Sequence, residues 1–285
     1  MKRSSSSSTR NASRAPRVGG SPLGQAVDYP ERYDPKLIYA LARAPQREAL
    51  GLKGELPFSG ADFWTAYEIT WLDPRGKPQL AVGGLRVPAD SPATVESKSL
   101  KLYLGSFAQE KLADRDALAR RIESDLSRAC GATVAVELRA PAMAAEPGML
   151  PGASLDDLDV ATNTYEPSPA FLVASGGIVE ETLRSALFRS RCPVTGQADY
   201  ADLMVRYRGR RIDRAGLLRY VISYRRHPAF HESCAERMFV DILERCAPQA
   251  LSVYARFLRR GGIDINPFRS NFEAAPPGPA RTARQ

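Results

Sequence analysis

Residues 96–107, ESKSLKLYLGSF, and residues 213–224, DRAGLLRYVISY, decide the fold, because a gapless shift of 117 residues lays one stretch on the other. The aligned pairs are Leu100 with Leu217, Tyr103 with Tyr220, Ser106 with Ser223 and Phe107 with Tyr224. The same shift lays VAVEL, residues 134–138, on LSVYA, residues 251–255. This self-similarity indicates two diverged copies of one structural unit.

Both copies predict the same order of elements: strand, strand, helix, helix, strand. In the first copy the expected strands are residues 62–73, 79–89 and 132–141, and the expected helices are 96–107 and 114–131. In the second copy the expected strands are 181–192, 199–212 and 250–260, and the expected helices are 214–226 and 231–246. Period-two alternation marks the strands, and apolar residues three or four apart mark the helices. The order predicts an α+β fold of two tandem modules, each an antiparallel sheet with two helices on one face.

Composition sets the expected boundaries. Residues 1–24 and 272–285 are rich in Ser, Arg, Gly and Pro and have little to bury, so we expect both tails to be disordered. The N-terminal module then covers residues 25–150 and the C-terminal module residues 151–271. Prolines interrupt the lead-in at residues 28–45, which predicts an extended arm rather than a long helix.

Strict alternation in the first strand predicts which side chains share a face. Phe63, Tyr67, Ile69 and Trp71 fall on one face, and Trp64 falls on the other. We therefore expect at least one of the two tryptophans to lie in the core.

Charge and composition exclude several classes of function. The 285-residue chain has a formal charge of +8, but residues 1–18 alone carry five basic residues and no acid, so a large nucleic-acid-binding face is not expected. No apolar run approaches the roughly 20 residues of a membrane-spanning helix, and we expect a cytoplasmic protein. Two histidines and four cysteines without a CxxC pair predict no metal site.

Each copy carries polar residues that the other lacks, which suggests one site built from two incomplete halves. The first copy has Glu96, Ser97 and Lys98, and the second has His231 and Glu232. Cys192 ends a predicted strand of the second copy, and Asp199 follows seven residues later, beyond a Pro- and Gly-containing turn. A thiol beside a carboxyl group can perform covalent catalysis, in which the thiolate attacks an electrophilic carbon and the acid supplies a proton.

Each of these residues also has a structural interpretation. Cys192 could be a buried structural thiol beside a turn that Asp199 caps. Glu96 suits a helix N-terminus, where the helix dipole favours an acid, and His231 and Glu232 suit a helix cap. Spacing alone leaves these alternatives open.

Four motifs in order resemble one family. They are ESKSLKLYLGSF (96–107), CPVTGQAD (192–199), HPAFHESCAERM (227–238) and FLRRGGIDINPF (257–268). Together they resemble the NADPH-dependent 7-cyano-7-deazaguanine reductases of queuosine biosynthesis, nitrile reductases of the tunnelling-fold (T-fold) superfamily in their long, two-module form. The resemblance runs from about Leu23 to Ser270 and implies reduction of a nitrile to a primary amine with two equivalents of NADPH.

The resemblance also implies roles for individual residues. Cys192 is the implied nucleophile, forming a covalent thioimide, and Asp199 the implied proton donor. The implied substrate contacts are Val95, Glu96, Ser97, His231 and Glu232. The implied NADPH contacts are Ser97, Lys98, Lys101, Arg260 and Gly261. No GxGxxG motif joins a strand to a helix, so we do not expect a Rossmann fold to hold the cofactor.

Two other functions and one assembly state follow from the same reasoning. A metal-dependent enzyme of the superfamily, such as a GTP cyclohydrolase or pterin synthase, needs more histidine ligands than the chain has. A non-catalytic module that binds a purine or pterin-like ligand is the alternative from another class. Because open sheets leave unpaired edges, we expect a homodimer, with a small-molecule substrate and no direct nucleic-acid or membrane partner.

Overall fold

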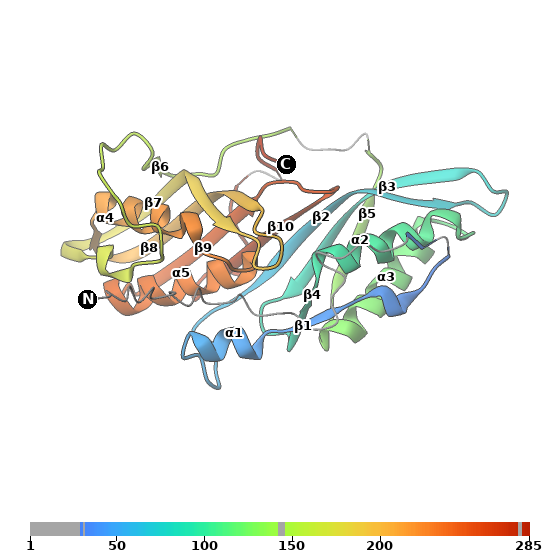
Figure 1. Cartoon of the computed structure of the whole chain (residues 1–285), viewed down its shortest axis with the longest axis horizontal. Coiled ribbons are helices and arrows are strands. Elements are labelled where there is room, and N and C mark those ends of the chain that lie inside the picture. The colour runs from blue at the N-terminus through green and yellow to red at the C-terminus, as the bar shows by residue number, and fades with distance from the viewer. Residues whose placement is uncertain (1–28, 31, 142–145, 279–280) are drawn as a thin grey trace, which may run out of the picture.

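The computed structural model describes residues 29–30, 32–141, 146–278 and 281–285 (Figure 1). The expected disordered tail at residues 1–24 lies outside this range. Eight strands form one continuous sheet in the order β5-β3-β2-β10-β9-β8-β7-β6. Their bounds are β5 (Ala135–Arg139), β3 (Pro78–Pro88), β2 (Ser59–Leu72), β10 (Ile263–Ser270), β9 (Ala250–Phe257), β8 (Ala198–Ile212), β7 (Ala174–Arg191) and β6 (Ala153–Ser154).

Each half of the sheet carries two longer helices. They are α2 (Ser97–Gly105) and α3 (Arg115–Cys130) in the first half, and α4 (Arg214–Ser223) and α5 (His231–Cys246) in the second. Asp114 and Asp213 accept backbone hydrogen bonds at the starts of α3 and α4, and Gly131, with φ of 67°, ends α3. The predicted α+β fold and the repeated order of elements are confirmed. None of the described helices is both long enough and apolar enough to cross a membrane.

Strand β10 joins the two halves. It pairs antiparallel with β2 along its whole length, from Ile263 opposite Ala66 to Ser270 opposite Ser59, and its C-terminal end pairs with β9. Both helix pairs pack on the same face of the sheet, each over its own core. A smaller cluster around Phe268 and Tyr254 lies on the opposite face. The modules therefore share one sheet, and their helices meet at a seam above β2 and β10.

A β-bulge changes which side chains of β2 share a face of the sheet. The register with β3 shifts between Ala66 and Ile69, so the alternation of side chains changes phase there. As a result Trp64 and Trp71 both lie in the first core, whereas Phe63 packs on the opposite face. The expectation that the tryptophans point in opposite directions was wrong, because strict alternation assumes an unbroken ladder.

The N-terminal arm lies across the seam. After the turn η1 (Pro35–Leu37), strand β1 (Ala40–Ala42) pairs with β4 (Ala93–Val95), and the short helix α1 (Ala44–Ala49) follows. Prolines within the arm keep its helical pieces short, as expected.

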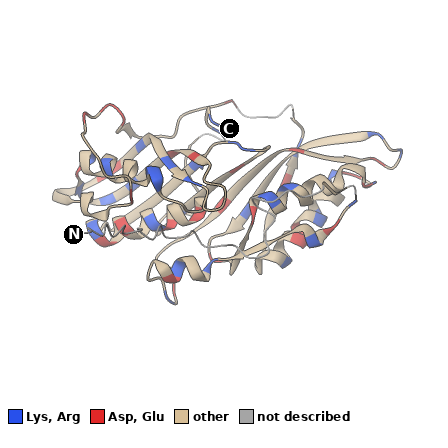
Figure 2. Cartoon of the chain, viewed as in Figure 1, with Lys and Arg blue, Asp and Glu red and all other residues tan. Residues whose placement is uncertain are grey.

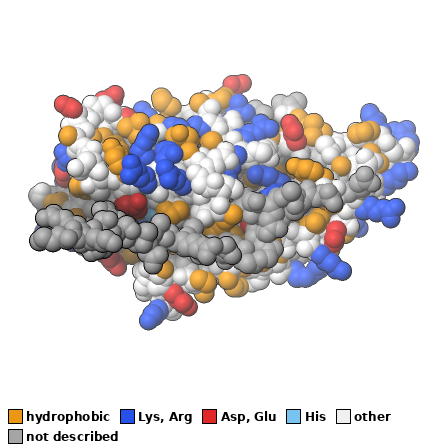
Figure 3. Space-filling view, in the orientation of Figure 1, with side chains coloured by type: hydrophobic (Ala, Val, Ile, Leu, Met, Phe, Trp, Pro, Cys, Tyr) orange, Lys and Arg blue, Asp and Glu red, His pale blue; other side chains and the backbone are white. Residues whose placement is uncertain are grey.

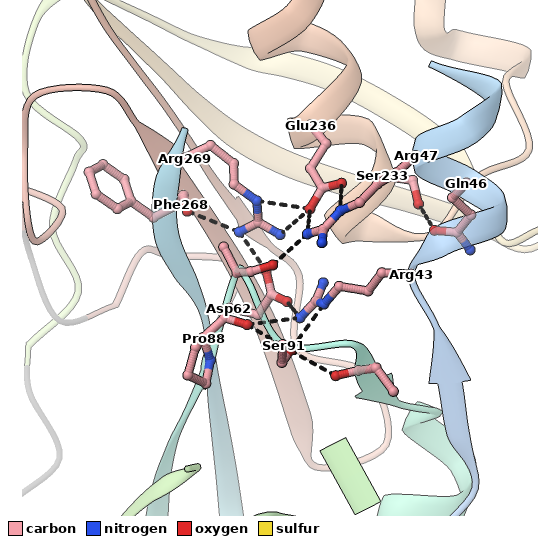
Figure 4. A network of polar contacts seen from close by, with 12 residues as sticks. Arg43, Gln46, Arg47, Asp62, Pro88, Ser91, Ser233, Glu236, Phe268 and Arg269 are labelled. Atoms are coloured by element: carbon pink, nitrogen blue, oxygen red, sulfur yellow. Dashed lines mark hydrogen bonds and ion pairs between the residues drawn. The ribbon is translucent and has the colours of Figure 1, made fainter. Parts of the chain in front are cut away.

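A buried ionic network fixes the arm to both halves (Figure 4). Arg269 of β10 contacts Asp62 of β2 at 2.8 Å and Glu236 of α5 at 2.9 Å. Arg43 of the arm contacts the other oxygen of Asp62 at 2.6 Å, and Arg47 of α1 contacts Glu236 at 2.7 Å. All five side chains are buried. The network therefore ties α1, β2, α5 and β10 together at one point.

The C-terminal segment differs from expectation. Within residues 272–285, Arg284 contacts Asp202 at 3.1 Å, Glu273 contacts Arg206 at 2.8 Å, and Gln285 donates to Asn266 at 2.6 Å. The segment has few apolar residues, but polar groups on the sheet supply its partners. Composition alone does not predict these contacts.

Charged side chains of both signs are interspersed over both halves (Figure 2). On the face shown in Figure 3, basic side chains gather over the C-terminal half and near the outer end of the β2–β3 hairpin.

Candidate active site

One cavity at the seam brings together residues from both halves. Its volume is about 30 Å³. Its lining residues are Leu41, Trp64, Val95, Ser97, Cys192, Pro193, Asp199, Ala229, Phe230, His231, Glu232, Arg260 and Ile265. Seven of these are candidates from the sequence: Val95, Ser97, Cys192, Asp199, His231, Glu232 and Arg260. The remaining candidates, Glu96, Lys98, Lys101 and Gly261, are not part of the lining.

A tight turn places the thiol next to the carboxyl group. Cys192 follows the last residue of β7, its N–H donates to the Gln197 carbonyl at 2.8 Å, and its own carbonyl accepts from Gly196 at 3.0 Å. Gly196 adopts φ of 72°, which glycine tolerates at little cost. The turn leads into β8, where Asp199 pairs with Ser190 of β7. The seven-residue spacing therefore folds back into one corner of the cavity.

Asp199 lies between two basic side chains. Its Oδ1 accepts from Arg260 Nη1 at 2.6 Å, and its Oδ2 lies 3.6 Å from His231 Nε2. The carboxyl group is 2% exposed and Cys192 is 5% exposed. The His231 ring packs on Phe257 with 3.9 Å between centroids, and its Nε2 has no hydrogen-bond partner among the described residues. This nitrogen is thus available to a ligand or to Asp199.

Glu232 is a buried carboxyl group in the cavity wall. Burial raises its pKa, and nearby Asp62 raises it further, while His231 and Arg43 act in the opposite direction. A buried acceptor facing a cavity suits a ligand with paired N–H donors.

Glu96 takes the helix-capping arrangement. It is buried at the start of α2, and its two carboxylate oxygens accept from the backbone N–H groups of Lys98 at 2.7 Å and Ser99 at 2.8 Å. Because these bonds occupy the side chain and it does not line the cavity, its substrate contact stays a prediction. Its cap does orient the first turn of α2, which presents Ser97 to the cavity.

Lys101 and Gly261 lie together at the rim of the cavity. Burial lowers the pKa of Lys101, and Arg260 lowers it further, while Glu96, Asp199 and Cys192 raise it. A Cβ on Gly261, where φ is 62°, would stand 3.0 Å from Lys101 Nζ. Two cations beside a glycine in the left-handed backbone conformation match the demands of a phosphorylated dinucleotide. The described residues contain no cluster of three His, Cys, Asp or Glu that could hold a metal.

The sequence reasoning missed the apolar part of the lining. Leu41 comes from the arm, Phe230 immediately precedes α5, and Ile265 lies on β10. Such side chains carry no motif of their own, and only the packing of distant segments brings them together. The one available signal was Trp64, a large aromatic residue in a predicted strand.

Comparison with known proteins identifies the family of the chain. The model of the family "Nitrile reductase, 7-cyano-7-deazaguanine-reductase N-term" matches residues 29–138, and the model "QueF-like protein" matches residues 198–276. A Bordetella pertussis protein named NADPH-dependent 7-cyano-7-deazaguanine reductase is 55% identical over 271 residues, which cover 94% of this chain and 99% of that protein. A Burkholderia vietnamiensis protein of the same name is 54% identical over 269 residues, or 93% and 98% of the two chains.

Among solved structures, the apo form of the archaeosine synthase QueF-Like matches with 20% identity and a TM-score of 0.30, covering 35% of this chain and 98% of that one. The identity and coverage of the Bordetella and Burkholderia relatives decide the assignment: the chain belongs to the family of NADPH-dependent 7-cyano-7-deazaguanine reductases.

Proposed function

We propose that the protein reduces the nitrile of 7-cyano-7-deazaguanine to the aminomethyl group of 7-aminomethyl-7-deazaguanine, using two NADPH per nitrile, as a step of queuosine biosynthesis. The observation that carries this proposal is the single cavity in which Cys192 and Asp199 of the second half face Val95 and Ser97 of the first. Strong sequence relatives carry the name of this activity.

Cys192 and Asp199 perform the first step. Asp199 accepts the proton of the Cys192 thiol, the sulfur adds to the nitrile carbon, and one π bond of the nitrile breaks. Asp199 then passes this proton to the nitrogen, which leaves a thioimide. Arg260 and His231 hold the Asp199 carboxyl group beside the thiol. His231 is placed to return a proton to Asp199 for the later steps.

The cavity then protects the reduction. Ser97, Lys98, Lys101, Arg260 and Gly261 would hold NADPH, which would supply one hydride for the thioimide carbon and one for the imine carbon. After the first of these, the C–S bond breaks, the electron pair returns to Cys192 as thiolate, and an imine remains. Apolar walls that include Trp64 and Phe230 keep water from this imine. Protonation of nitrogen after the second hydride yields the amine.

The ratio of NADPH oxidised to nitrile consumed tests the proposed reaction. Purified protein mixed with 7-cyano-7-deazaguanine and NADPH should oxidise two NADPH for each nitrile consumed, as measured by absorbance and by chromatography of the base. Binding of the nitrile by a folded sample without NADPH oxidation would instead support a non-catalytic purine-binding module.

Glu232 is expected to recognise the guanine-like edge of the substrate, and this predicts a pH dependence. Only the carboxylate accepts two hydrogen bonds from the ring N–H and amino group, so binding weakens as pH falls through the Glu232 pKa. Burial raises that pKa above its ordinary value of 4.5, and the acidic limb of kcat/KM should therefore lie above pH 4.5. In Glu232→Gln the KM for the nitrile should rise about 10–100-fold and this limb should disappear.

The control is Glu244→Gln, an exposed acid on the same helix, which should leave both KM and the pH profile unchanged. An acidic limb that persists in Glu232→Gln would assign the titration to another group.

We also propose a homodimer. In the described structure the sheet ends at β5, whose outer edge has no paired strand, and such edges favour association. Sedimentation equilibrium should give about twice the chain mass of 31.2 kDa, and a mass of one chain would contradict the proposal.

The proposed partners and location follow from the chemistry. The substrate is a free base, so the reaction needs no nucleic-acid partner. The free thiols of the described cysteines suit the reducing cytoplasm.

A further inference from the structure

A second cavity, here called the arginine pocket, lies beside the active site. Its volume is about 350 Å³, and its lining residues are Tyr165, Arg189, Arg191, Arg225 and Arg226. Arg189 and Arg191 come from the last three residues of β7, and Arg225 and Arg226 end the turn η5 (Tyr224–Arg226) between α4 and α5. Four arginines from two segments thus line one hollow.

No described acid forms an ion pair with any of the four. This contrasts with Arg206, Arg211 and Arg260 elsewhere on the sheet, each of which contacts a carboxylate within 3 Å. Like charges gathered without a counter-charge repel one another, and a cavity focuses their positive potential. The arrangement therefore fits an anion that arrives from solution.

Contacts that do not neutralise the arginine side chains hold the pocket in shape. Arg189 donates to the Arg225 carbonyl and lies over the Tyr200 ring, 5.8 Å from its centroid. Arg226 lies over the Tyr165 ring at 5.4 Å. Stacked guanidinium groups keep their planes ordered while their N–H forks can still pair with phosphate oxygens.

Two short segments connect the arginine pocket to the catalytic cavity. Arg191 directly precedes Cys192, and Arg226 is three residues before Ala229, which lines the catalytic cavity. The segments run side by side, since Arg191 N–H donates to the His227 carbonyl at 2.9 Å and Ala229 N–H donates to the Arg191 carbonyl at 3.1 Å. Three residues span at most about 11 Å. The backbone at Arg226 therefore lies within about 11 Å of Ala229 in the wall of the catalytic cavity.

We propose that the arginine pocket binds a phosphate group of NADPH. This proposal rests on the proposed function and adds a binding site for one part of its cofactor. Of the two reactants, the nitrile base carries no phosphate, whereas NADPH carries a pyrophosphate and a 2′-phosphate. Arginine forks bind phosphate oxygens in a bidentate manner. Lys101 and Arg260 lie at the catalytic cavity itself. The part of the dinucleotide that extends beyond this cavity carries phosphate, and the arginine pocket binds that part.

The test is direct binding of NADPH to the full chain by isothermal titration calorimetry. The double variant Arg225→Gln/Arg226→Gln removes two exposed charges and leaves the core intact. Its Kd for NADPH should rise at least about 10-fold, while the Kd for the nitrile, measured without cofactor, should stay within about 2-fold.

The matched control is Arg115→Gln/Arg120→Gln, which removes the same charge from exposed positions on α3 and should leave the Kd for NADPH unchanged. Titration with NADH identifies the group: a loss confined to NADPH assigns the 2′-phosphate, and an equal loss for NADH assigns the pyrophosphate. An unchanged Kd for NADPH in the Arg225/Arg226 variant, or an equal loss in the control, overturns the proposal. A wild-type chain that binds NADPH but does not reduce the nitrile refutes the proposed reaction and leaves the arginine pocket standing.

Discussion

Cys192→Ala is expected to lower kcat for nitrile reduction by at least about 10⁴-fold, because removal of a covalent nucleophile leaves only binding and orientation. The cavity would lose a single sulfur atom, and Asp199, Arg260 and His231 would keep their contacts. The variant should therefore fold and still bind NADPH and the nitrile. Turnover is measured as NADPH oxidation at saturating nitrile.

Cys246→Ala is the matched control. This thiol is also buried, but it ends α5 within the second core and does not line the cavity. Turnover should stay within a few-fold of wild type. If Cys192→Ala retained substantial turnover, nucleophilic catalysis by this residue would be refuted.

Arg269→Met is expected to destabilise the fold by about 3–5 kcal/mol, the usual effect of removing one partner from a buried ionic network. Arg269 is 0% exposed and contacts both Asp62 and Glu236. Its loss would leave each carboxylate with one arginine partner where it had two, Arg43 for Asp62 and Arg47 for Glu236. Equilibrium unfolding in urea at neutral pH measures the change.

The same network predicts how this loss depends on pH. Burial alone would raise the pKa values of Asp62 and Glu236, but the arginines outweigh it and both are lowered. A lowered carboxyl pKa contributes stability that is complete above the unfolded-state values, 3.8 for Asp and 4.5 for Glu, and disappears as pH falls through the folded-state values. The difference between wild type and Arg269→Met should therefore be largest at neutral pH and shrink in acid.

Arg139→Met is the control for the network. Arg139 pairs with Glu137 at 2.6 Å on exposed β5, and such surface pairs contribute about 0–1 kcal/mol. A loss at Arg269 no larger than at Arg139 would show that the buried network does not hold the arm and the two halves together.

Much of the site could be predicted because its chemistry lies in short local motifs. The turn after Cys192 brings Asp199 back beside it through local geometry alone, and Gly196 permits the reversal. The complementary polar residues of the two copies predicted one shared site, and of these Ser97, His231 and Glu232 line one cavity. The order of elements was equally accessible, because helix and strand periodicity is a local property.

The rest depends on contacts between distant segments. The bulge after Ala66, which turns both tryptophans into one core, cannot be read from alternating residues. Arg43, Arg47 and Arg269 resemble surface charges in the sequence, and only the fold buries them with partners. The structure also shows that Glu96 caps the N-terminus of α2, an arrangement that spacing alone could not decide.

The most direct test of the account is intact-mass analysis of the full chain incubated with 7-cyano-7-deazaguanine in the absence of NADPH. The account predicts a mass increase of one substrate molecule, mapped to the peptide that contains Cys192, and its disappearance when NADPH is added. A folded sample that reduces the nitrile yet shows no adduct on Cys192 would contradict covalent catalysis at this residue.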